Sequence, residues 1–243
     1  MPHLLNNYFD KIYCINLDSR PDRWALVNRR FQQQGIEVSR FSAADGYSDD
    51  LEREFDLIQN AFETKQKKHP RYLKNPRALG CLLSVMQIID HARSNGYQKI
   101  LLFDDDVIFH KHFDQLLENL PPVSSWKLLY LGCSQHQWHD ITMLDGYSYL
   151  ARHTHGSFAV GIDASVFSEI HDLMAMKQKN CDIYLMEIQE RYPDDCLVLR
   201  PNLVIADVRD SMIRDARYPR PHAMRVKWNL RDYHMDWPRR MKL

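Results

Sequence analysis

The chain has 243 residues, of which 44% are hydrophobic and 26% charged, a composition typical of a globular protein with one substantial core. Lys and Arg equal Asp and Glu at 32 each, so the formal net charge is zero, which argues against a strongly basic nucleic-acid-binding protein. The charges are nevertheless segregated: residues 209–243 carry ten Lys and Arg against four Asp and Glu, and the first 208 residues have the opposite excess. We predict a main domain over 1–208 and a basic, aromatic C-terminal extension over 209–243, packed on or near it.

No stretch of the sequence is suited to span a membrane. The longest uncharged apolar runs, 78–89 and 128–139, have twelve residues each, whereas a bilayer requires about 18–20. Residues 1–7 lack the basic start and apolar core of a secretion signal. Five cysteines without C-x-x-C spacing are typical of reduced thiols rather than of a disulfide framework or a zinc site. We therefore expect a cytoplasmic protein.

The first predicted elements are a strand, a helix and a second strand. Residues 11–16 are apolar and β-prone, and Pro21 marks the first turn of a helix that ends at Gly35, where a left-handed C-cap favours glycine. Residues 36–41 then form the second strand. Two strands joined by a helix indicate a right-handed crossover and a parallel pair, so the pattern favours an α/β fold.

The polar region that follows leads to a clear helix and a buried strand. Residues 47–75 predict a helix over 49–62 and a mobile loop. Asn75 and the proline after it then cap a helix whose apolar residues recur at helical spacing as far as Gly96. The unbroken apolar run 99–103 is typical of a strand buried on both faces, and it ends at three consecutive aspartates.

Alternating helices and strands continue through the second half of the domain. The pattern predicts helices over 113–120, 163–176 and 182–191, a buried strand over 127–131, a strand over 157–161 and edge strands over 196–199 and 203–206.

The three aspartates, Asp104, Asp105 and Asp106, come directly after a buried strand, where open α/β sheets bind their ligands. Carboxylate oxygens without nearby thiolates select Mg²⁺ or Mn²⁺, and such an ion commonly holds a diphosphate. An acidic loop that caps the next helix is the alternative, but three adjacent like charges repel one another unless a cation is bound. The histidine pairs elsewhere in the chain lack the helical H-E-x-x-H spacing of a zinc site and are expected to be structural.

The sequence also resembles a known family. Four blocks carry the resemblance, and they are residues 12–23, 41–46, 79–84 and 100–107. The blocks are similar to glycosyltransferase family 25, which includes lipooligosaccharide galactosyltransferases and is related to collagen galactosyltransferases. Two departures lie within the blocks or beside them: the family usually has Glu-Asp-Asp at 104–106, and Ser-His where this chain has Ser84 and Val85.

The resemblance implies a GT-A type fold, a Rossmann-like, mostly parallel sheet flanked by helices, with inverting, metal-assisted transfer from a nucleotide-sugar donor. A UDP-sugar, with galactose favoured, is the implied donor, and Mn²⁺ or Mg²⁺ is the implied cofactor. Asp104 and Asp106 would hold the metal and diphosphate, and Asp105 the hydroxyls of the donor sugar or ribose. The resemblance also implies a role in donor binding for Ser84, within the third block.

Further candidate residues follow other predicted strands. Asn16, Asp18, Arg20 and Arg23 follow the first strand, where they could hold a base, ribose or phosphate; a solvated helix start is the alternative for the two arginines. Asp45 closes the second strand, either near the nucleotide or in a plain turn.

Two later residues complete the set. Asp182 matches a family aspartate and is the candidate catalytic base, with helix capping as its alternative. His155 is a candidate contact to the acceptor or donor.

The expected acceptor is a glycan or lipid-linked glycan in lipopolysaccharide, lipooligosaccharide or surface glycan synthesis, and no nucleic acid is expected to bind. The basic C-terminus could contact anionic lipid at the inner face of a membrane, it could fold back over the active site and meet the phosphates of the donor, or it could be a solvated extension. Two other functions compete: a glycosyltransferase-like protein that binds nucleotide-sugars without turnover, and a metal-dependent phosphohydrolase.

Overall fold

The computed structural model describes residues 3–140, 142–209, 211, 213 and 218–235. A seven-stranded sheet forms its centre, in the order β2-β1-β3-β7-β5-β8-β6, and a two-stranded sheet pairs β4 with β9. The strands are β1 Lys11–Asn16, β2 Ser39–Ser42, β3 Lys99–Asp104, β4 Val107–Phe109, β5 Leu128–Ser134, β6 Ser148–Leu150, β7 His155–Asp163, β8 Cys196–Leu199 and β9 Val204–Ala206. The helices are α1 Leu4–Tyr8, α2 Pro21–Gln34, α3 Asp49–Ala61, α4 Thr64–Lys68, α5 Pro76–Ser94, α6 Phe113–Leu117, α7 Phe167–Ala175, α8 Cys181–Arg191 and α9 Pro219–Val226.

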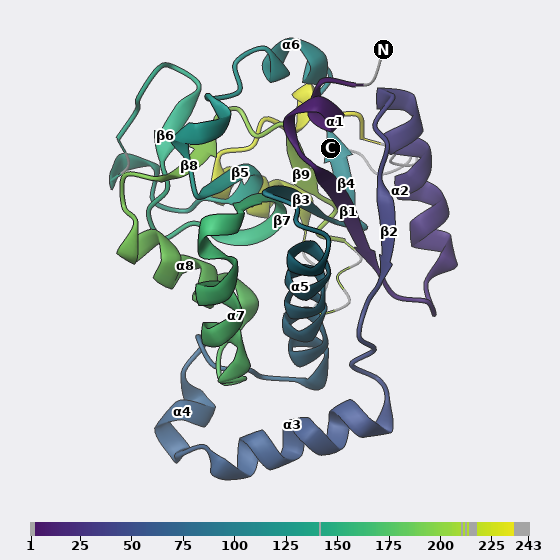
Figure 1. Cartoon of the computed structure of the whole chain (residues 1–243), viewed down its shortest axis with the longest axis vertical. Coiled ribbons are helices and arrows are strands. Elements are labelled where there is room, and N and C mark those ends of the chain that lie inside the picture. Colours follow the sequence, from purple (N-terminus) through teal and green to yellow (C-terminus); the bar gives the residue numbers. More distant parts are fainter. Residues whose placement is uncertain (1–2, 141, 210, 212, 214–217, 236–243) are drawn as a thin grey trace.

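The sheet is mostly parallel, as the sequence predicts. β1, β2, β3, β5 and β8 run in one direction, and β6 and β7 run in the other. Figure 1 shows α5 and α7 side by side over one face of this sheet, α2 on the other side, and α3 with α4 as a separate excursion. The architecture confirms an α/β, Rossmann-like fold of the GT-A type.

Both faces of the sheet are buried, because successive side chains of a strand point to opposite sides. On β3, Ile100 and Leu102 pack with the α5, α7 and α8 layer, whereas Leu101 and Phe103 pack with the layer of α1, α2 and α6. Burial on both sides explains why this strand has a continuous apolar sequence.

Some predicted boundaries were wrong. The second strand begins at Ser39 rather than at residue 36, because Gly35 has φ 70° and Ile36 N–H still donates to Phe31 at the end of α2. The helix predicted over 113–120 ends at Leu117.

The two predicted edge strands also differ from expectation. Cys196–Leu199 lies inside the large sheet, between β5 and β6, and all four of its residues are buried. The second, β9, is not part of the large sheet. It pairs with β4, the strand that directly follows the three aspartates.

Two aromatic residues of the predicted C-terminal extension contact earlier parts of the chain. The Tyr233 hydroxyl donates to the Asn202 carbonyl oxygen at 2.7 Å, and the Trp228 ring packs edge-on against Phe158. Trp237, the last aromatic residue of the predicted extension, lies outside the described residues.

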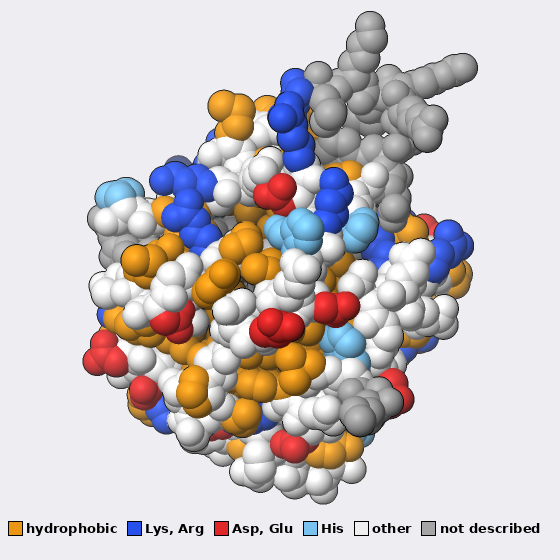
Figure 2. Space-filling view, turned by 90° about the horizontal axis from the view of Figure 1, so that it is seen from above, with side chains coloured by type: hydrophobic (Ala, Val, Ile, Leu, Met, Phe, Trp, Pro, Cys, Tyr) orange, Lys and Arg blue, Asp and Glu red, His pale blue; other side chains and the backbone are white. Residues whose placement is uncertain are grey.

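Surface charge, cysteine state and helix hydrophobicity were three further expectations from the sequence. Figure 2 views the molecule from above Figure 1, on the side of α6, and its coloured acidic, basic and hydrophobic side chains are interspersed. All five cysteines are free thiols, and no described helix is long and apolar enough to cross a bilayer.

Candidate functional site

The carboxyl ends of β1, β2 and β3 meet at one edge of the large sheet, which we call the carboxyl edge. β5 also ends there, at Ser134, and β7 begins beside it because it runs antiparallel, with His155 paired to Ser134. Ligands of open α/β sheets bind at such an edge. A pocket opens at this edge, and we call it the central pocket; its polar or charged lining side chains are Asn16, Arg23, Tyr47, Arg77, Cys81, Asp104, Asp105, Asp106, Ser134, Ser211, His222 and Trp228.

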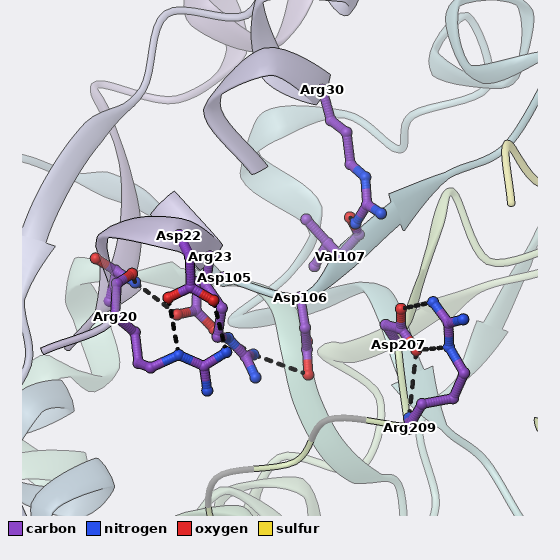
Figure 3. A network of polar contacts seen from close by, with 10 residues as sticks. Arg20, Asp22, Arg23, Arg30, Asp105, Asp106, Val107, Asp207 and Arg209 are labelled. Atoms are coloured by element: carbon purple, nitrogen blue, oxygen red, sulfur yellow. Dashed lines mark hydrogen bonds and ion pairs between the residues drawn. The ribbon is translucent and has the colours of Figure 1, made fainter. Parts of the chain in front are cut away.

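The three predicted aspartates all line this pocket. Asp104 is the last residue of β3, and Asp105 and Asp106 form the turn into β4. Arg23 reaches them from α2: its Nε donates to Asp105 Oδ1 at 2.8 Å, and its Nη2 lies 3.3 Å from Asp106 Oδ2 (Figure 3). One arginine therefore joins two of the three acids.

Burial makes the charged forms of two of these acids unfavourable. Desolvation, with repulsion from Asp106 as the next cause, raises the pKa of Asp104 well above its usual value. Desolvation also raises the pKa of Asp106 to about 7, although Arg23 opposes the rise. Asp106 Oδ1 is buried and has no hydrogen-bond partner in the structure. Two desolvated carboxylates with an unsatisfied oxygen fit a divalent cation, which would compensate their charge.

A ligand set made only of protein side chains is not formed here. Within the described part of the chain, no three His, Cys, Asp or Glu side chains converge as a metal site. Mg²⁺ commonly uses one or two carboxylates and completes its shell with water and substrate phosphates. The donor set of Asp104 and Asp106 therefore suits an ion that binds together with a diphosphate.

Asp105 has a different environment from its neighbours. Its Oδ2 accepts a hydrogen bond from Asn16 Nδ2 at 2.7 Å, while its Oδ1 accepts from Arg23. Asn16 in turn accepts from Arg40 Nε at 2.8 Å. Asp105 thus fixes the end of β1 and the start of α2 relative to the acidic turn.

The other residues predicted after the first strand lie farther out. The exposed carboxylate of Asp18 accepts from Arg40 Nη2 and from the Ser42 hydroxyl, both at 2.6 Å, and these hydrogen bonds lower its pKa. The Arg20 Nε donates to Asp22 Oδ1 at 2.9 Å. Neither Asp18 nor Arg20 lines the central pocket, whereas Asn16 and Arg23 do.

The segment after β2 forms another wall of the pocket. Gly46 packs so closely on the start of α5 that a Cβ there would lie 2.4 Å from the Arg77 Cα. The Asp45 carboxylate accepts from the Tyr47 N–H at 2.9 Å, and this hydrogen bond fixes the turn. Asp45 does not line the pocket. Ser84 is fully buried: its hydroxyl accepts from Ala44 N–H at 2.9 Å and donates to the Gly80 carbonyl at 2.7 Å. Ser84 therefore holds the pocket wall against α5.

Several pocket residues come from the C-terminal third, where the sequence named no individual site residue, although a tail folded back over the active site was one of the alternatives. His222 and Trp228 line the pocket, and their rings stack edge-on with centroids 5.1 Å apart. Asp207 lies beside the acidic turn, since its N–H donates to the Asp106 carbonyl at 2.9 Å (Figure 3). The concentration of aromatic residues among cations in the extension was the available signal.

A second depression, which we call the side groove, adjoins the central pocket. The two share six residues in their linings, namely Ile15, Cys81, Asp104, Ser134, Gly156 and Ile213. Asp182 and His155 both line the groove, with Asp182 Oδ2 3.7 Å from His155 Nδ1. Asp182 lies in the first turn of α8, and its side chain is only 16% exposed. The structure thus brings the predicted base and His155 together, next to the acidic turn.

The fold and the site define an α/β protein of the GT-A type with an acidic pocket at the carboxyl edge of its sheet. Residues 9–151 match the sequence pattern of glycosyltransferase family 25 (LPS biosynthesis protein). Because the match covers more than half of the chain, this protein belongs to glycosyltransferase family 25. The resemblance seen in the four sequence blocks is thereby confirmed.

Individual relatives are similar at modest identity. The chain is 26% identical over 157 residues to a glycosyltransferase 25 family member of Anopheles gambiae, which covers 62% of this chain and 26% of the relative. It is 28% identical over 137 residues to procollagen galactosyltransferase 2 of Homo sapiens, covering 53% and 21%. It is also 27% identical over 143 residues to inactive glycosyltransferase 25 family member 3 of Homo sapiens, covering 57% and 24%. The matched region spans about a quarter of the length of these relatives.

Proposed function

We propose that this protein transfers a sugar from a nucleotide-sugar donor to a hydroxyl of a glycan acceptor, with inversion and with the help of a divalent cation. The observation that carries the proposal is the pair of desolvated carboxylates, Asp104 and Asp106, in a pocket at the carboxyl edge of the sheet. Family membership supplies the class of reaction. A UDP-sugar donor, with galactose favoured, follows from the family resemblance.

The residues of the central pocket suit the parts of such a donor. Asp104 and Asp106 would hold Mn²⁺ or Mg²⁺, which neutralises the charge that develops on the leaving diphosphate. Arg23 keeps the acidic turn in place through Asp105, and Arg77 adds a second cation to the lining of the pocket. The Trp228 and Tyr47 rings offer apolar faces for a base or a sugar ring.

The acceptor would enter through the side groove. Its hydroxyl must lose a proton as the new glycosidic bond forms, and a carboxylate can accept that proton. Asp182 is our candidate base because it lies in the groove that adjoins the acidic turn. His155, whose Nδ1 lies 3.7 Å from Asp182 Oδ2, would orient this carboxylate and contact the acceptor.

The family description, which refers to LPS biosynthesis, supports the acceptor class. We propose a glycan or lipid-linked glycan on the cytoplasmic side of a membrane. Exposed Arg220 and Lys227, with the exposed Tyr218 and Met224, would let the C-terminal region contact anionic lipid. Each well-placed cation would contribute about 1 kcal/mol to such binding.

Thermal denaturation with nucleotide-sugars tests the proposal. A ligand that binds only the folded state raises the melting temperature, so UDP-galactose with Mn²⁺ should raise it in the wild type and in the control Asp56→Asn, which changes an exposed acid on α3. Asp106→Asn should remove the part of the rise that depends on Mn²⁺. Absence of a rise with a panel of UDP-sugars plus Mn²⁺ would refute the proposed donor class.

Donor binding without turnover is a second candidate. The similarity to a human family member named inactive favours it, as does Val85 at a position where the family usually has histidine. Measuring UDP release with and without a panel of glycan acceptors separates the two functions. A melting-temperature rise without any UDP release would support the binding protein.

A further inference from the structure

The side groove is lined by basic side chains beyond the part it shares with the central pocket. Arg71 and Lys74 come from the segment between α4 and α5, and Arg225 comes from α9. His136 and His153 also line the groove. Three elements that are distant in sequence therefore bring cationic or protonatable groups to one depression.

Backbone hydrogen bonds fix the positions of these basic residues. The Arg71 carbonyl accepts from Asn180 N–H at 3.1 Å, and Leu73 N–H donates to the Gln178 carbonyl at 2.9 Å. These bonds hold the Arg71 segment against the start of α8. Near Arg225, the carbonyl of Val226 accepts from Trp138 Nε1 at 3.0 Å, which ties the end of α9 to the segment that carries His136.

Arg71 and Arg225 are exposed residues, and neither forms an ion pair with an acid within the described part of the chain. The groove contains two acids, Asp104 and Asp182. Asp182 Oδ2 lies 3.7 Å from His155 Nδ1, and Asp104 lines the part that the groove shares with the central pocket. Both arginines line the groove without an acidic partner, so their guanidinium groups are available to a ligand bound there.

Building on the proposed function, we propose that the side groove binds an acceptor saccharide that carries a negatively charged substituent, a carboxylate or a phosphate. Arg71 and Arg225 would bind this substituent, since the planar guanidinium donates paired hydrogen bonds to either anion. Binding the anion there would orient a neighbouring hydroxyl toward Asp182 and the shared end of the groove. The charged substituent itself does not react.

This inference is tested by measuring how tightly matched saccharides bind to the whole protein. Ligand-observed NMR, in the absence of donor, gives the equilibrium affinities. One arm compares 3′-sialyllactose with lactose, and the other compares galactose 6-phosphate with galactose. We expect at least one charged saccharide to bind about tenfold or more tightly than its neutral counterpart, the effect of one charged hydrogen bond. The arm that shows the preference identifies the anion, and added salt should weaken it.

Arg71→Gln and Arg225→Gln should each remove most of this preference and leave the binding of the neutral saccharide unchanged. Arg29→Gln is the matched control, because Arg29 is an exposed arginine on α2 that lines neither depression. All three variants should keep the melting-temperature rise produced by UDP-galactose and Mn²⁺.

Two results would overturn the inference: equal binding of charged and neutral saccharides in both arms, including no binding of either, or a preference that survives both groove substitutions. Neither result depends on donor binding, so the failure of this inference and the failure of the proposed function can be told apart.

Discussion

Replacing Asp106 by Asn should stabilise the protein when no metal is present. Asn resembles the protonated form of Asp in shape and charge, and burial favours that form by raising the pKa of Asp106 from 3.8 to about 7. At about 1.4 kcal/mol for each pH unit, ionising this buried group reduces the free energy of unfolding by about 4 kcal/mol. The substitution removes that loss, together with the repulsion of Asp104.

The stability gained by Asp106→Asn should increase with pH. Because the folded protein binds the Asp106 proton more tightly than the unfolded chain, this contribution to stability is complete below about pH 4 and declines until about pH 7. Asp106→Asn should therefore gain about 2 kcal/mol over wild type at pH 5 and about 4 kcal/mol at pH 8. For a chain of this size, each kcal/mol corresponds to about 2–4 °C in melting temperature.

Thermal and urea denaturation in a chelating buffer measure the difference, with Asp56→Asn as the control that should change little at either pH. Added Mn²⁺ should reverse the order at pH 8, because it compensates the two carboxylates only in the wild type. Two results would refute the assignment of Asp106 as a desolvated acid. In one, the variant is less stable than wild type at pH 8; in the other, the variant and wild type differ in free energy of unfolding by the same amount at pH 5 and pH 8.

The remaining predictions concern the pocket wall and the base. Ser84→Ala should lower the free energy of unfolding by about 1–3 kcal/mol, because it leaves the Ala44 N–H unsatisfied, and urea denaturation should show this with donor binding retained. Gly80→Ala should lower the melting temperature and weaken donor binding, since its Cβ would lie 2.5 Å from the Ala44 carbonyl oxygen; an unchanged thermal shift would contradict this. Asp182→Asn should reduce turnover about 100-fold or more without changing the thermal shift by donor, and turnover near wild type would remove it from the mechanism.

Local sequence was sufficient to predict the elements that build the carboxyl edge. The apolar run before Asp104 has the composition of a strand buried on both faces, and Asn75 with Pro76 marks the start of α5, where the Asn75 side chain accepts from Ala78 N–H. These signals depend on neighbouring residues and on the periods of strands and helices. They placed the acids at the end of a strand before any contact was known.

Direction and pairing of strands depended on distant contacts. Nothing local in β7 specifies that it runs antiparallel between β3 and β5, or that β9 leaves the large sheet to pair with β4. Those choices bring His155 to the carboxyl edge and place Asp207 beside Asp106.

For individual polar residues too, some properties depend on local sequence and others on tertiary contacts. The sequence by itself determined that acids, amides and arginines gather after the strands, because a residue's place relative to the end of its own strand is a local property. Only the tertiary structure decided that Asp105 is held by Asn16 and Arg23, that Ser84 is buried against Ala44, and that Asp106 keeps an unsatisfied oxygen. Burial and hydrogen-bond partners are set by chain segments far apart in sequence, and those two quantities decide which carboxylate can receive a cation.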